Sequence, residues 1–384
     1  MKLNYADTQR RAAVIQSARR IVIKVGTRLL TDSDGDSDGS RIGQLIAEIA
    51  GLRQRGMEII LVTSGAIGAG MRVLEITRRP VQLPRLQALA AVGQLRLMSF
   101  YEAAARQHQF HCGQVLLCAD DLQDRERHLN TAFCIDTLLG GRVLPIINEN
   151  DSVSVEEIKF GDNDRLAAMV AMLVRADLTI LLTSVDGLHE MHNRTLGRRI
   201  SLVSEFHHKL RVMALDTADR DSSVGGMASK LSAAETLAKA GEPTWIADGR
   251  DFSVLQRIFA GDDLGTLFVP GGNGRMSNRK RYLAFFSEPN GAIVIDAGAA
   301  QALTKPRGAS LLARGVTDCQ GGFVRGDTVR VLTTDGDEIA RGVSNYSHPE
   351  VAMIKGLHSH EIKKLLGNTA GYDCVIHRNY LVLT

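Results

Sequence analysis

A cluster of acidic and carboxamide side chains follows a short apolar stretch in residues 144–165, LPIINENDSVSVEEIKFGDNDR. Its members all present oxygens that accept hydrogen bonds from a cation: Asn148, Glu149, Asn150, Asp151, Asp162, Asn163 and Asp164. Grouped carboxylates repel one another unless a positive charge lies among them. Three kinds of cation meet this demand: a metal ion, an ammonium group on a ligand, or lysines from elsewhere in the chain.

Two lysines stand where an anion could be bound. Lys24 lies within the apolar run RIVIKVGT (20–27), where a lysine is seldom left without an anionic partner. The alternative is a lysine that snorkels to the surface at a strand end. Lys230 ends the Gly-rich motif SSVGGMASK (222–230), in the first turn of an expected helix. Backbone N–H groups, the helix dipole and a mobile ammonium together suit a phosphoryl group.

A second Gly-rich turn, TSGAIGAG (63–70), also joins an expected strand to an expected helix. Backbone N–H groups at such a helix start can hold an anion, and the alternative is a tight turn with close helix packing. The glycines at 65, 68 and 70 form GxxGxG, so the dinucleotide fingerprint GxGxxG is absent. GxxxxGK[ST] is also absent, so any nucleotide is bound without a Walker loop.

Near-continuous apolar strands alternate with segments of helical period up to residue 270. The expected strands are 20–27, 57–64, 113–118, 142–148, 178–184 and 243–247. Strands that are apolar on both faces, with helices between them, predict a three-layer α/β/α sandwich with a mainly parallel central sheet. Ligands bind at the carboxyl ends of such strands, so the lysines, the Gly-rich turns and the acidic cluster are expected to meet there.

The pattern changes after residue 270. A Gly-rich joint, VPGGNGRMSNRKR (269–281), is followed by short alternating strands and turns that predict a small β-rich module. We therefore expect an N-terminal extension (1–18), a catalytic domain (19–270), a linker (271–282) and a C-terminal domain (283–384).

Composition sets outer limits on the function. With 384 residues, 44% apolar content and a net charge of +3, the chain can bury a large core but offers weak evidence for a polyanionic partner. Its five cysteines form no CxxC pair, so neither a disulfide framework nor a zinc knuckle is indicated. A signal peptide and an apolar run of membrane-spanning length are absent, and we expect a soluble cytoplasmic protein.

Seven motifs occur in order and together closely resemble the glutamate 5-kinases of the amino acid kinase family. They are IKVGTRLLT, ILVTSGAIGAG, LAAVGQLRLM, DRERHLN, PIINENDSV, KFGDND and GGMASKL. The part from NRKRYLAF onward is similar to the PUA domain that many of these enzymes carry. The resemblance covers nearly the whole chain except residues 1–18, and INEND with GDND is specific to this branch of the family.

The resemblance implies a reaction and a set of partners. The reaction is phosphoryl transfer from MgATP to the γ-carboxylate of L-glutamate, giving L-glutamyl 5-phosphate in the first step of proline biosynthesis. Feedback inhibition by proline, a homo-oligomer (dimer or tetramer) and glutamate 5-phosphate reductase as a pathway partner are also implied. Mg²⁺ is expected to be held mainly by ATP oxygens, with no metal ligand from the protein.

The family pattern also implies roles for individual residues. Lys24 and Lys230 stabilise the transferring phosphoryl group, and Asp164 orients both lysines. A general base is not required, because a carboxylate nucleophile is already ionised at neutral pH. The implied substrate-binding residues are Ser64, Gly65, Asn148, Asp151, Asp162 and Asn163. The implied nucleotide-binding residues are Lys24, Thr183, Ser184, Val224, Gly225, Gly226, Met227, Ala228, Ser229 and Lys230.

Three departures from the family pattern concern the nucleotide. Ser184 follows Thr183 where the family usually has a Thr-Asp pair, and Ser223 and Val224 replace the usual Gly-Thr. His189 stands where a tyrosine is common. These changes bear on nucleotide affinity and leave the lysines and the glutamate pocket intact.

The acidic segment TDSDGDSDGS (31–40) partly fits a calcium loop. Asp34, Asp36, Asp38 and Gly39 match its first half, but the twelfth position is Leu45 instead of glutamate. An acidic, flexible surface hairpin is the favoured interpretation.

Two other functions compete with phosphoryl transfer. PUA domains elsewhere bind RNA, but from residue 277 to 384 there are 13 Lys and Arg against 10 Asp and Glu, which is thin for a phosphate-contacting surface. A structural or regulatory role for this module is therefore favoured over RNA binding. A dehydrogenase with a Rossmann core lacks its glycine fingerprint.

Overall fold

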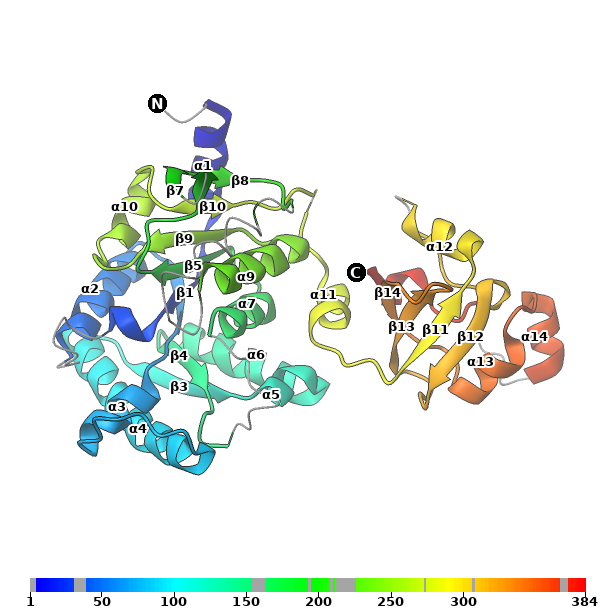
Figure 1. Ribbon diagram of the computed structural model, residues 1–384, viewed down its shortest axis with the longest axis horizontal. Coiled ribbons are helices and arrows are strands. Elements are labelled where there is room, and N and C mark those ends of the chain that lie inside the picture. The colour runs from blue at the N-terminus through cyan, green and yellow to red at the C-terminus, as the bar shows by residue number, and fades with distance from the viewer. Residues whose placement is uncertain are drawn as a thin grey trace. The chain divides into compact units, whose positions relative to one another are not determined.

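The computed structural model divides into two compact units (Figure 1). The first unit comprises Met1–Leu122 and Glu126–Arg275, and the second comprises Gln123–Arg125 and Met276–Thr384. The structure describes residues 5–30, 39–153, 163–192, 195–207, 210, 226–272, 274–305, 308–366 and 372–384. Most of the acidic segment 31–40 lies outside these ranges, so its interpretation as a hairpin stays a prediction.

The first unit is built on an eight-stranded, mainly parallel sheet, which confirms the predicted fold class. In spatial order its strands are β3 (Cys112–Leu117), β4 (Leu144–Glu149), β2 (Glu58–Val62), β1 (Arg20–Val25), β5 (Leu178–Thr183), β9 (Thr244–Asp248), β10 (Thr266–Phe268) and β8 (Leu202–Val203). The six predicted strands are all present. Strand β10, which runs antiparallel to β9, and the short β8 beside it are not predicted from the sequence.

Helices cover both faces of this sheet, as in a three-layer sandwich. One face packs against α2 (Ser40–Gln54), α4 (Leu83–Gln107) and α10 (Val254–Ala260), whose apolar side chains share one core with the strands. The other face carries α7 (Asn163–Val174) and α9 (Met227–Ala240), which contact each other as well as β1, β5 and β9. Figure 1 shows these two helices together on one side of the sheet.

Strand register brings the residues of interest to one edge of the sheet. Lys24 in β1 pairs with Val62 of β2 and with Leu181 of β5. On the next pair of strands, Asn148 of β4 lies opposite Leu116 of β3. Because all of these strands run in the same direction, their carboxyl ends and the turns that follow them meet at this edge.

The described residues of the first unit also include further helices and a hairpin. They are α1 (Tyr5–Ser17), α3 (Ala66–Val73), α5 (Ala119–Gln123), α6 (Arg125–Gly140) and the hairpin of β6 (His189–His192) with β7 (Thr195–Arg199).

Helix α1 was not expected from the sequence, because it carries little apolar periodicity. Its buried residue is Arg11, whose guanidinium donates 2.7 Å hydrogen bonds to the carbonyl oxygens of Ser201 and Leu264. The same guanidinium lies 4.4 Å from the ring centroid of Trp245 in β9. Burial lowers the pKa of Arg11 to about 10, so it stays charged at neutral pH. One arginine thus fastens α1 to the β8–β9–β10 end of the sheet.

The second unit is the small β-rich module that the sequence predicts. Its five-stranded sheet has the order β12 (Val316–Gly321), β11 (Gly291–Ile295), β13 (Thr328–Thr333), β14 (Glu338–Val343) and β15 (Leu381–Leu383). The helices of this unit are α11 (Asn278–Phe285), α12 (Ala297–Thr304), α13 (His348–Ile354) and α14 (Ser359–Leu366). A separate apolar core, with Phe323, Tyr346 and Val375 among its members, lies under this sheet.

Among the helices in the described ranges, none has an 18-residue stretch apolar enough to cross a membrane.

Candidate active site

Three charged side chains form a buried cluster at the carboxyl edge of the first unit's sheet, which we call the ion triad: Lys24, Asp164 and Lys230. Lys24 Nζ lies 2.7 Å from Asp164 Oδ1, and Lys230 Nζ lies 2.9 Å from Asp164 Oδ2. Asp164 is fully buried, and the two lysines are only 5% and 6% exposed. The alternative in which Lys24 snorkels to the surface is therefore wrong.

Each member of the ion triad comes from the end of a regular element. Lys24 is the penultimate residue of β1, Asp164 lies in the first turn of α7, and Lys230 lies in the first turn of α9. The helix starts aim positive dipole ends at this edge, and Asp164 benefits from that field. Three elements far apart in the sequence therefore bring two ammonium groups to one carboxylate.

The electrostatics of Asp164 follow from its two partners. Burial alone would raise the pKa of Asp164, but the charges and hydrogen bonds of Lys24 and Lys230 outweigh it and lower the pKa below its ordinary value. Asp164 is therefore ionised at neutral pH. With both of its oxygens engaged by ammonium groups, it fixes where the lysines stand.

A neutral network lies beside the ion triad, which we call the carboxamide chain: Asn163, Asn148, Gln94 and Gln114. Asn163 Nδ2 donates to Asn148 Oδ1, Asn148 Nδ2 donates to Gln94 Oε1, and Gln94 Nε2 donates to Gln114 Oε1, each at 3.0 Å. The chain joins α7 to β4, α4 and β3. Asn148 and Gln94 are buried.

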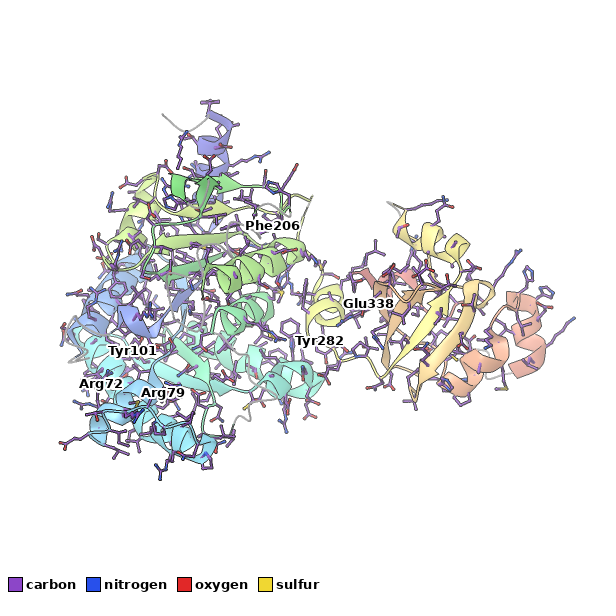
Figure 2. All side chains as sticks on the ribbon, in the orientation of Figure 1. Arg72, Arg79, Tyr101, Phe206, Tyr282 and Glu338 are labelled. Carbon is purple, nitrogen blue, oxygen red and sulfur yellow. The ribbon has the colours of Figure 1, made fainter. Side chains whose placement is uncertain are left out.

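Two backbone groups fix the direction of these hydrogen bonds. Asn163 Nδ2 also donates to the carbonyl oxygen of Thr63, which can only accept, and the backbone N–H of Glu149 donates to Asn148 Oδ1 at 3.0 Å. Thr63 is held in turn by Tyr101, a buried residue labelled in Figure 2, whose hydroxyl lies 2.8 Å from Thr63 Oγ1. The oxygen and nitrogen ends of the carboxamides are therefore determined.

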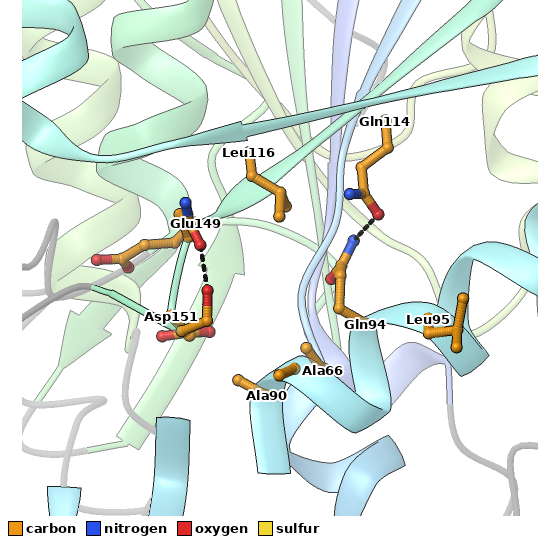
Figure 3. Close-up of a pocket in the computed structure, with 11 residues that line it drawn as sticks. Ala66, Ala90, Gln94, Leu95, Gln114, Leu116, Glu149 and Asp151 are labelled. Carbon is orange, nitrogen blue, oxygen red and sulfur yellow. Dashed lines mark hydrogen bonds between the residues drawn. The ribbon is translucent and has the colours of Figure 1, made fainter. Parts of the chain in front are cut away.

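A cavity of about 210 Å³ opens at the far end of the carboxamide chain (Figure 3). Its lining combines polar groups of β3, β4 and the following turn with small or apolar residues of α3 and α4: Ala66, Ala90, Ala91, Gln94, Leu95, Gln114, Leu116, Glu149, Asn150, Asp151 and Ser152. Asn150 and Ser152 are joined by a 2.6 Å hydrogen bond between Asn150 Oδ1 and Ser152 Oγ. The predicted residue Asp151 thus lines a cavity, whereas Asp162 lies outside the described residues.

The turn after β2 holds Ser64 and Gly65. Ser64 Oγ donates to the carbonyl oxygen of Val25 and accepts from Thr27 Oγ1, both at 3.2 Å, so the turns after β1 and β2 are joined. Gly65 directly precedes α3 with a left-handed φ of 105°.

The later glycine of this turn serves helix packing. A Cβ at Gly70 of α3 would lie 1.9 Å from the carbonyl oxygen of Leu89 in α4. In α4 itself, a Cβ at Gly93 would lie 1.8 Å from the carbonyl oxygen of Ala66. The close-packing alternative for the Gly-rich turn therefore describes Gly70, and α3 and α4 meet backbone to backbone.

The residues expected to hold a nucleotide lie on the other side of β1. Thr183 ends β5 and its carbonyl oxygen accepts from Gly249 N at 2.8 Å, while Ser184 begins the following turn. Gly226 precedes α9, and Met227, Ala228 and Ser229 form its first turn ahead of Lys230. Val224 and Gly225 lie outside the described residues.

His189, at the position where a tyrosine is common, takes part in local contacts. Its Nε2 lies 2.7 Å from Asp186 Oδ1 and its Nδ1 lies 2.9 Å from the carbonyl oxygen of Gly197. The imidazole thereby ties the turn after β5 to the β6–β7 hairpin.

Sequence reasoning missed Gln94 and Gln114. Gln94 falls on the buried stripe of α4, between Gly93 and Leu97, where a polar residue breaks an otherwise apolar pattern. That break is a signal that can be read from the sequence. Gln114 gives no such signal, because it sits in a short strand with polar and apolar neighbours.

Within the described ranges, no group of three or more His, Cys, Asp or Glu side chains is arranged to hold a metal ion. Each oxygen of Asp164 lies within 3 Å of a lysine ammonium. That Mg²⁺ is held mainly by ATP oxygens stays a prediction.

Comparison with known proteins places this geometry in a family. The amino acid kinase family model matches residues 19–248, and the PUA domain model matches residues 291–366. Among curated relatives, glutamate 5-kinase from Trichlorobacter lovleyi is 43% identical over 375 residues, covering 97% of this chain and 99% of the relative. Glutamate 5-kinase from Caldanaerobacter subterraneus is 45% identical over 366 residues, covering 95% and 97%.

A third relative and a solved structure extend the comparison. Glutamate 5-kinase from Geobacter sulfurreducens is 43% identical over 375 residues, covering 97% of this chain and all of the relative. Carbamate kinase from Giardia lamblia bound to AMP-PNP is 17% identical with a TM-score of 0.48, covering 66% of this chain and 99% of that one.

Proposed function

Because the chain belongs to the amino acid kinase family, and within it to the glutamate 5-kinases, we propose that its ion triad transfers the γ-phosphoryl group of ATP to the γ-carboxylate of L-glutamate. The product is L-glutamyl 5-phosphate and the reaction opens proline biosynthesis. The observation that carries this proposal is the placement of two buried lysines on one ionised aspartate, whose neighbour Asn163 begins the carboxamide chain that leads to the cavity.

The lysines act on the charge of the migrating group. Phosphoryl transfer needs little covalent chemistry from the protein, and its main requirements are positioning and electrostatic stabilisation. Lys24 and Lys230 supply two ammonium groups in a site that is almost closed to water, where such charges act more strongly than in solvent. Both lysines are assigned to the oxygens of the transferring phosphoryl group.

Asp164 is a positioning residue in this mechanism. It holds both ammonium groups in place before the substrates arrive, so little reorganisation is needed when charge develops on the phosphoryl group. The nucleophile is a carboxylate and is ionised at neutral pH, so a general base is not needed. Mg²⁺, held mainly by ATP oxygens, supplies further charge neutralisation.

The two substrates take opposite sides of β1. ATP is assigned to the turn at Thr183 and Ser184 and to the start of α9, including Val224, Gly225, Gly226, Met227, Ala228 and Ser229. L-Glutamate is assigned to Ser64, Gly65, Asn148, Asp151, Asp162 and Asn163, with Asp151 as an acceptor for the α-ammonium group. The support for this division is the order of the strands, with β2 and β4 on one side of β1 and β5 and β9 on the other.

Further properties are proposed from the family alone. They are inhibition by proline, assembly into a homodimer or homotetramer, a cytoplasmic location, and glutamate 5-phosphate reductase as the pathway partner. For the PUA domain we favour a structural or regulatory role over RNA binding, because its net positive charge is small. Weak tRNA binding that is lost at moderate salt supports that choice, and tight salt-resistant binding contradicts it.

One assay tests the main proposal. ADP release is measured with L-glutamate, L-aspartate, N-acetyl-L-glutamate and UMP offered in turn with MgATP. L-Glutamate is expected to give the highest kcat/KM, and hydroxylamine is expected to trap the acyl phosphate as a hydroxamate. A higher kcat/KM for N-acetyl-L-glutamate or UMP would assign the chain to another branch of the family.

A further inference from the structure

The cavity has two chemically different walls. Gln94 of α4 and Gln114 of β3 present carboxamides on one side, while Glu149 and Asp151 present carboxylates on the other (Figure 3). Between them lie short or apolar side chains, including Ala90 and Leu116. A ligand that suits this cavity combines a cation, which the acidic wall attracts, with hydrogen-bond acceptors for the carboxamide wall.

The direction of the carboxamide chain decides which atoms of the second wall are available. Gln94 Oε1 accepts from Asn148 and Gln114 Oε1 accepts from Gln94, so both oxygens are engaged by neighbours. The NH₂ groups are still available as donors. The NH₂ group of Gln94 donates one of its two hydrogens to Gln114, and the NH₂ group of Gln114 makes no hydrogen bond within the described residues. This wall therefore offers donors, which suit an anion.

The same chain gives the direction in which a ligand must lie. Its first member, Asn163, is the neighbour of Asp164 in the ion triad, and its last member, Gln114, lies at the cavity. An elongated acceptor whose reacting carboxylate lies at the lysines therefore extends along the carboxamides, with its other end between the two walls. Ligand pockets for drug-sized molecules measure about 300–1,000 Å³, so a cavity of 210 Å³ suits the head of a small metabolite.

From these contacts we infer that the NH₂ groups of Gln94 and Gln114 bind the α-carboxylate of the amino acid acceptor, opposite an α-ammonium held by Glu149 and Asp151. This inference rests on the proposed glutamate phosphorylation and adds two specificity-determining residues to it. Gln114 is the sharper probe, because its NH₂ group is not shared with another member of the chain.

Steady-state kinetics of Gln114→Leu and Gln94→Leu in the full chain test this inference. A hydrogen bond to a charged group accounts for a factor of about 10 to 100 in affinity. KM for L-glutamate is therefore expected to rise about 10- to 100-fold for Gln114→Leu, with kcat and KM for ATP changed less than about threefold. Gln94→Leu is expected to raise KM at least as much, since it also releases Asn148.

Two analogues identify the group that is recognised. L-Norvaline keeps the α-carboxylate and the α-ammonium but lacks the γ-carboxylate, and 4-aminobutyrate keeps an amine and the reacting carboxylate but lacks the α-carboxylate. Both are tested as competitive inhibitors against L-glutamate, and their inhibition constants are compared between wild type and Gln114→Leu. The substitution is expected to raise the inhibition constant of L-norvaline by the same factor as KM for L-glutamate. Inhibition by 4-aminobutyrate is expected to be the same in Gln114→Leu as in wild type, including the case in which this analogue inhibits neither protein.

The control is Gln107→Leu, an exposed glutamine on the same helix as Gln94, which should behave as wild type. An unchanged KM for L-glutamate in Gln114→Leu overturns the inference. A fall in kcat without a rise in KM overturns it as well. So does an equal loss of inhibition by both analogues. Failure of the wild-type protein to phosphorylate L-glutamate would instead refute the proposed function, so the two failures are distinguishable.

Discussion

The ion triad and the carboxamide chain begin at consecutive residues, Asp164 and Asn163, yet they are built from opposite kinds of interaction. Asp164 is fully buried and bonded to two cations, while Asn163 passes neutral amide hydrogen bonds from one carboxamide to the next. In the proposed mechanism, the charged cluster lies where charge moves during the reaction. The neutral carboxamides lie along the proposed acceptor path, where binding requires recognition and no chemistry.

The difference follows from the cost of burying charge. A buried ion must be paired and hydrogen-bonded. Removing one partner leaves an uncompensated charge in the interior, which destabilises the folded protein. Amide dipoles are less costly to bury once every group has a partner, and they fix direction without shifting the protonation of their neighbours. We therefore expect substitutions in the ion triad to reduce turnover, and substitutions in the carboxamide chain to weaken acceptor binding.

The largest effect is expected from Lys230→Ala or Lys24→Ala. Either change removes an ammonium group that stabilises the transferring phosphoryl group, so kcat should fall about 10³-fold or more. KM for L-glutamate should change only a few-fold in the residual activity. The exposed Lys239 of α9 provides the matched control, and Lys239→Ala should have wild-type kcat. A rise in KM with kcat intact would assign the lysines to acceptor binding.

A smaller loss of turnover but a clear loss of stability is expected for Asp164→Asn. The change leaves two buried ammonium groups without their anion, so the free energy of unfolding at pH 7 should fall by about 3 kcal/mol. MgATP should stabilise this variant more than wild type, because phosphate oxygens replace the missing charge. Denaturant titrations with and without MgATP measure both effects, and equal stabilisation of the two proteins would argue against contact between the lysines and the nucleotide.

The same pair of proteins gives a pH dependence. Because the folded-state pKa of Asp164 is lowered, its ionised form contributes stability that is fully present above the unfolded pKa of about 4. That contribution is lost as pH falls through the folded pKa. The difference in unfolding free energy between wild type and Asp164→Asn should therefore shrink from pH 7 to pH 3, and a difference that stays constant contradicts the lowered pKa.

On the acceptor side of the site, Asp151→Ala should mainly raise KM for L-glutamate, by about 10- to 100-fold. Its carboxylate lines the cavity and is assigned to the α-ammonium group, which takes no part in phosphoryl transfer. Initial-rate kinetics with both substrates varied separate the effect from KM for ATP, which should stay constant. The exposed Asp120 serves as the control, with Asp120→Ala kinetically silent.

The smallest kinetic effect is expected at a buried cation outside both groups. Arg11→Met removes hydrogen bonds to Ser201 and Leu264, so the free energy of unfolding should fall by about 2 kcal/mol while kcat changes less than about threefold. The neighbouring Arg10 is exposed, and Arg10→Met should leave both quantities unchanged. A large loss of kcat in Arg11→Met would show that burial of a cation alone, without contact to the reacting groups, affects turnover.

Much of this arrangement could be predicted from the sequence. Apolar strands alternating with amphipathic helices gave the six main strands of the sheet, and the position of Lys24 inside an apolar run pointed to an anionic partner. Asp164 could be assigned to the same site because it follows a strand end in a parallel sheet. Lys230 could be assigned to it from the Gly-rich motif at a helix start and from the family pattern.

The other features depend on contacts between distant residues, which produce no periodic pattern in the sequence. Arg11 is buried because carbonyl groups about 190 and 250 residues away accept its hydrogen bonds, and its helix has little apolar pattern to reveal this. Strand β10 has three residues and runs against the prevailing direction, so it reads as a loop. Gln94 and Gln114 lie twenty residues apart on different kinds of element, and only the fold pairs them.

The backbone contact between α3 and α4 has a consequence for how acceptor preference can change in this fold. A Cβ added at Gly70 or at Gly93 would lie less than 2 Å from a carbonyl oxygen of the other helix. A larger residue at either position would therefore push α3 and α4 apart and displace Gln94. Residues larger than glycine are therefore excluded at these two positions. The cavity can be reshaped instead at its lining side chains, Ala90, Ala91 and Leu95 on α4 and Leu116 on β3, which is where directed evolution of a new substrate range should concentrate its libraries.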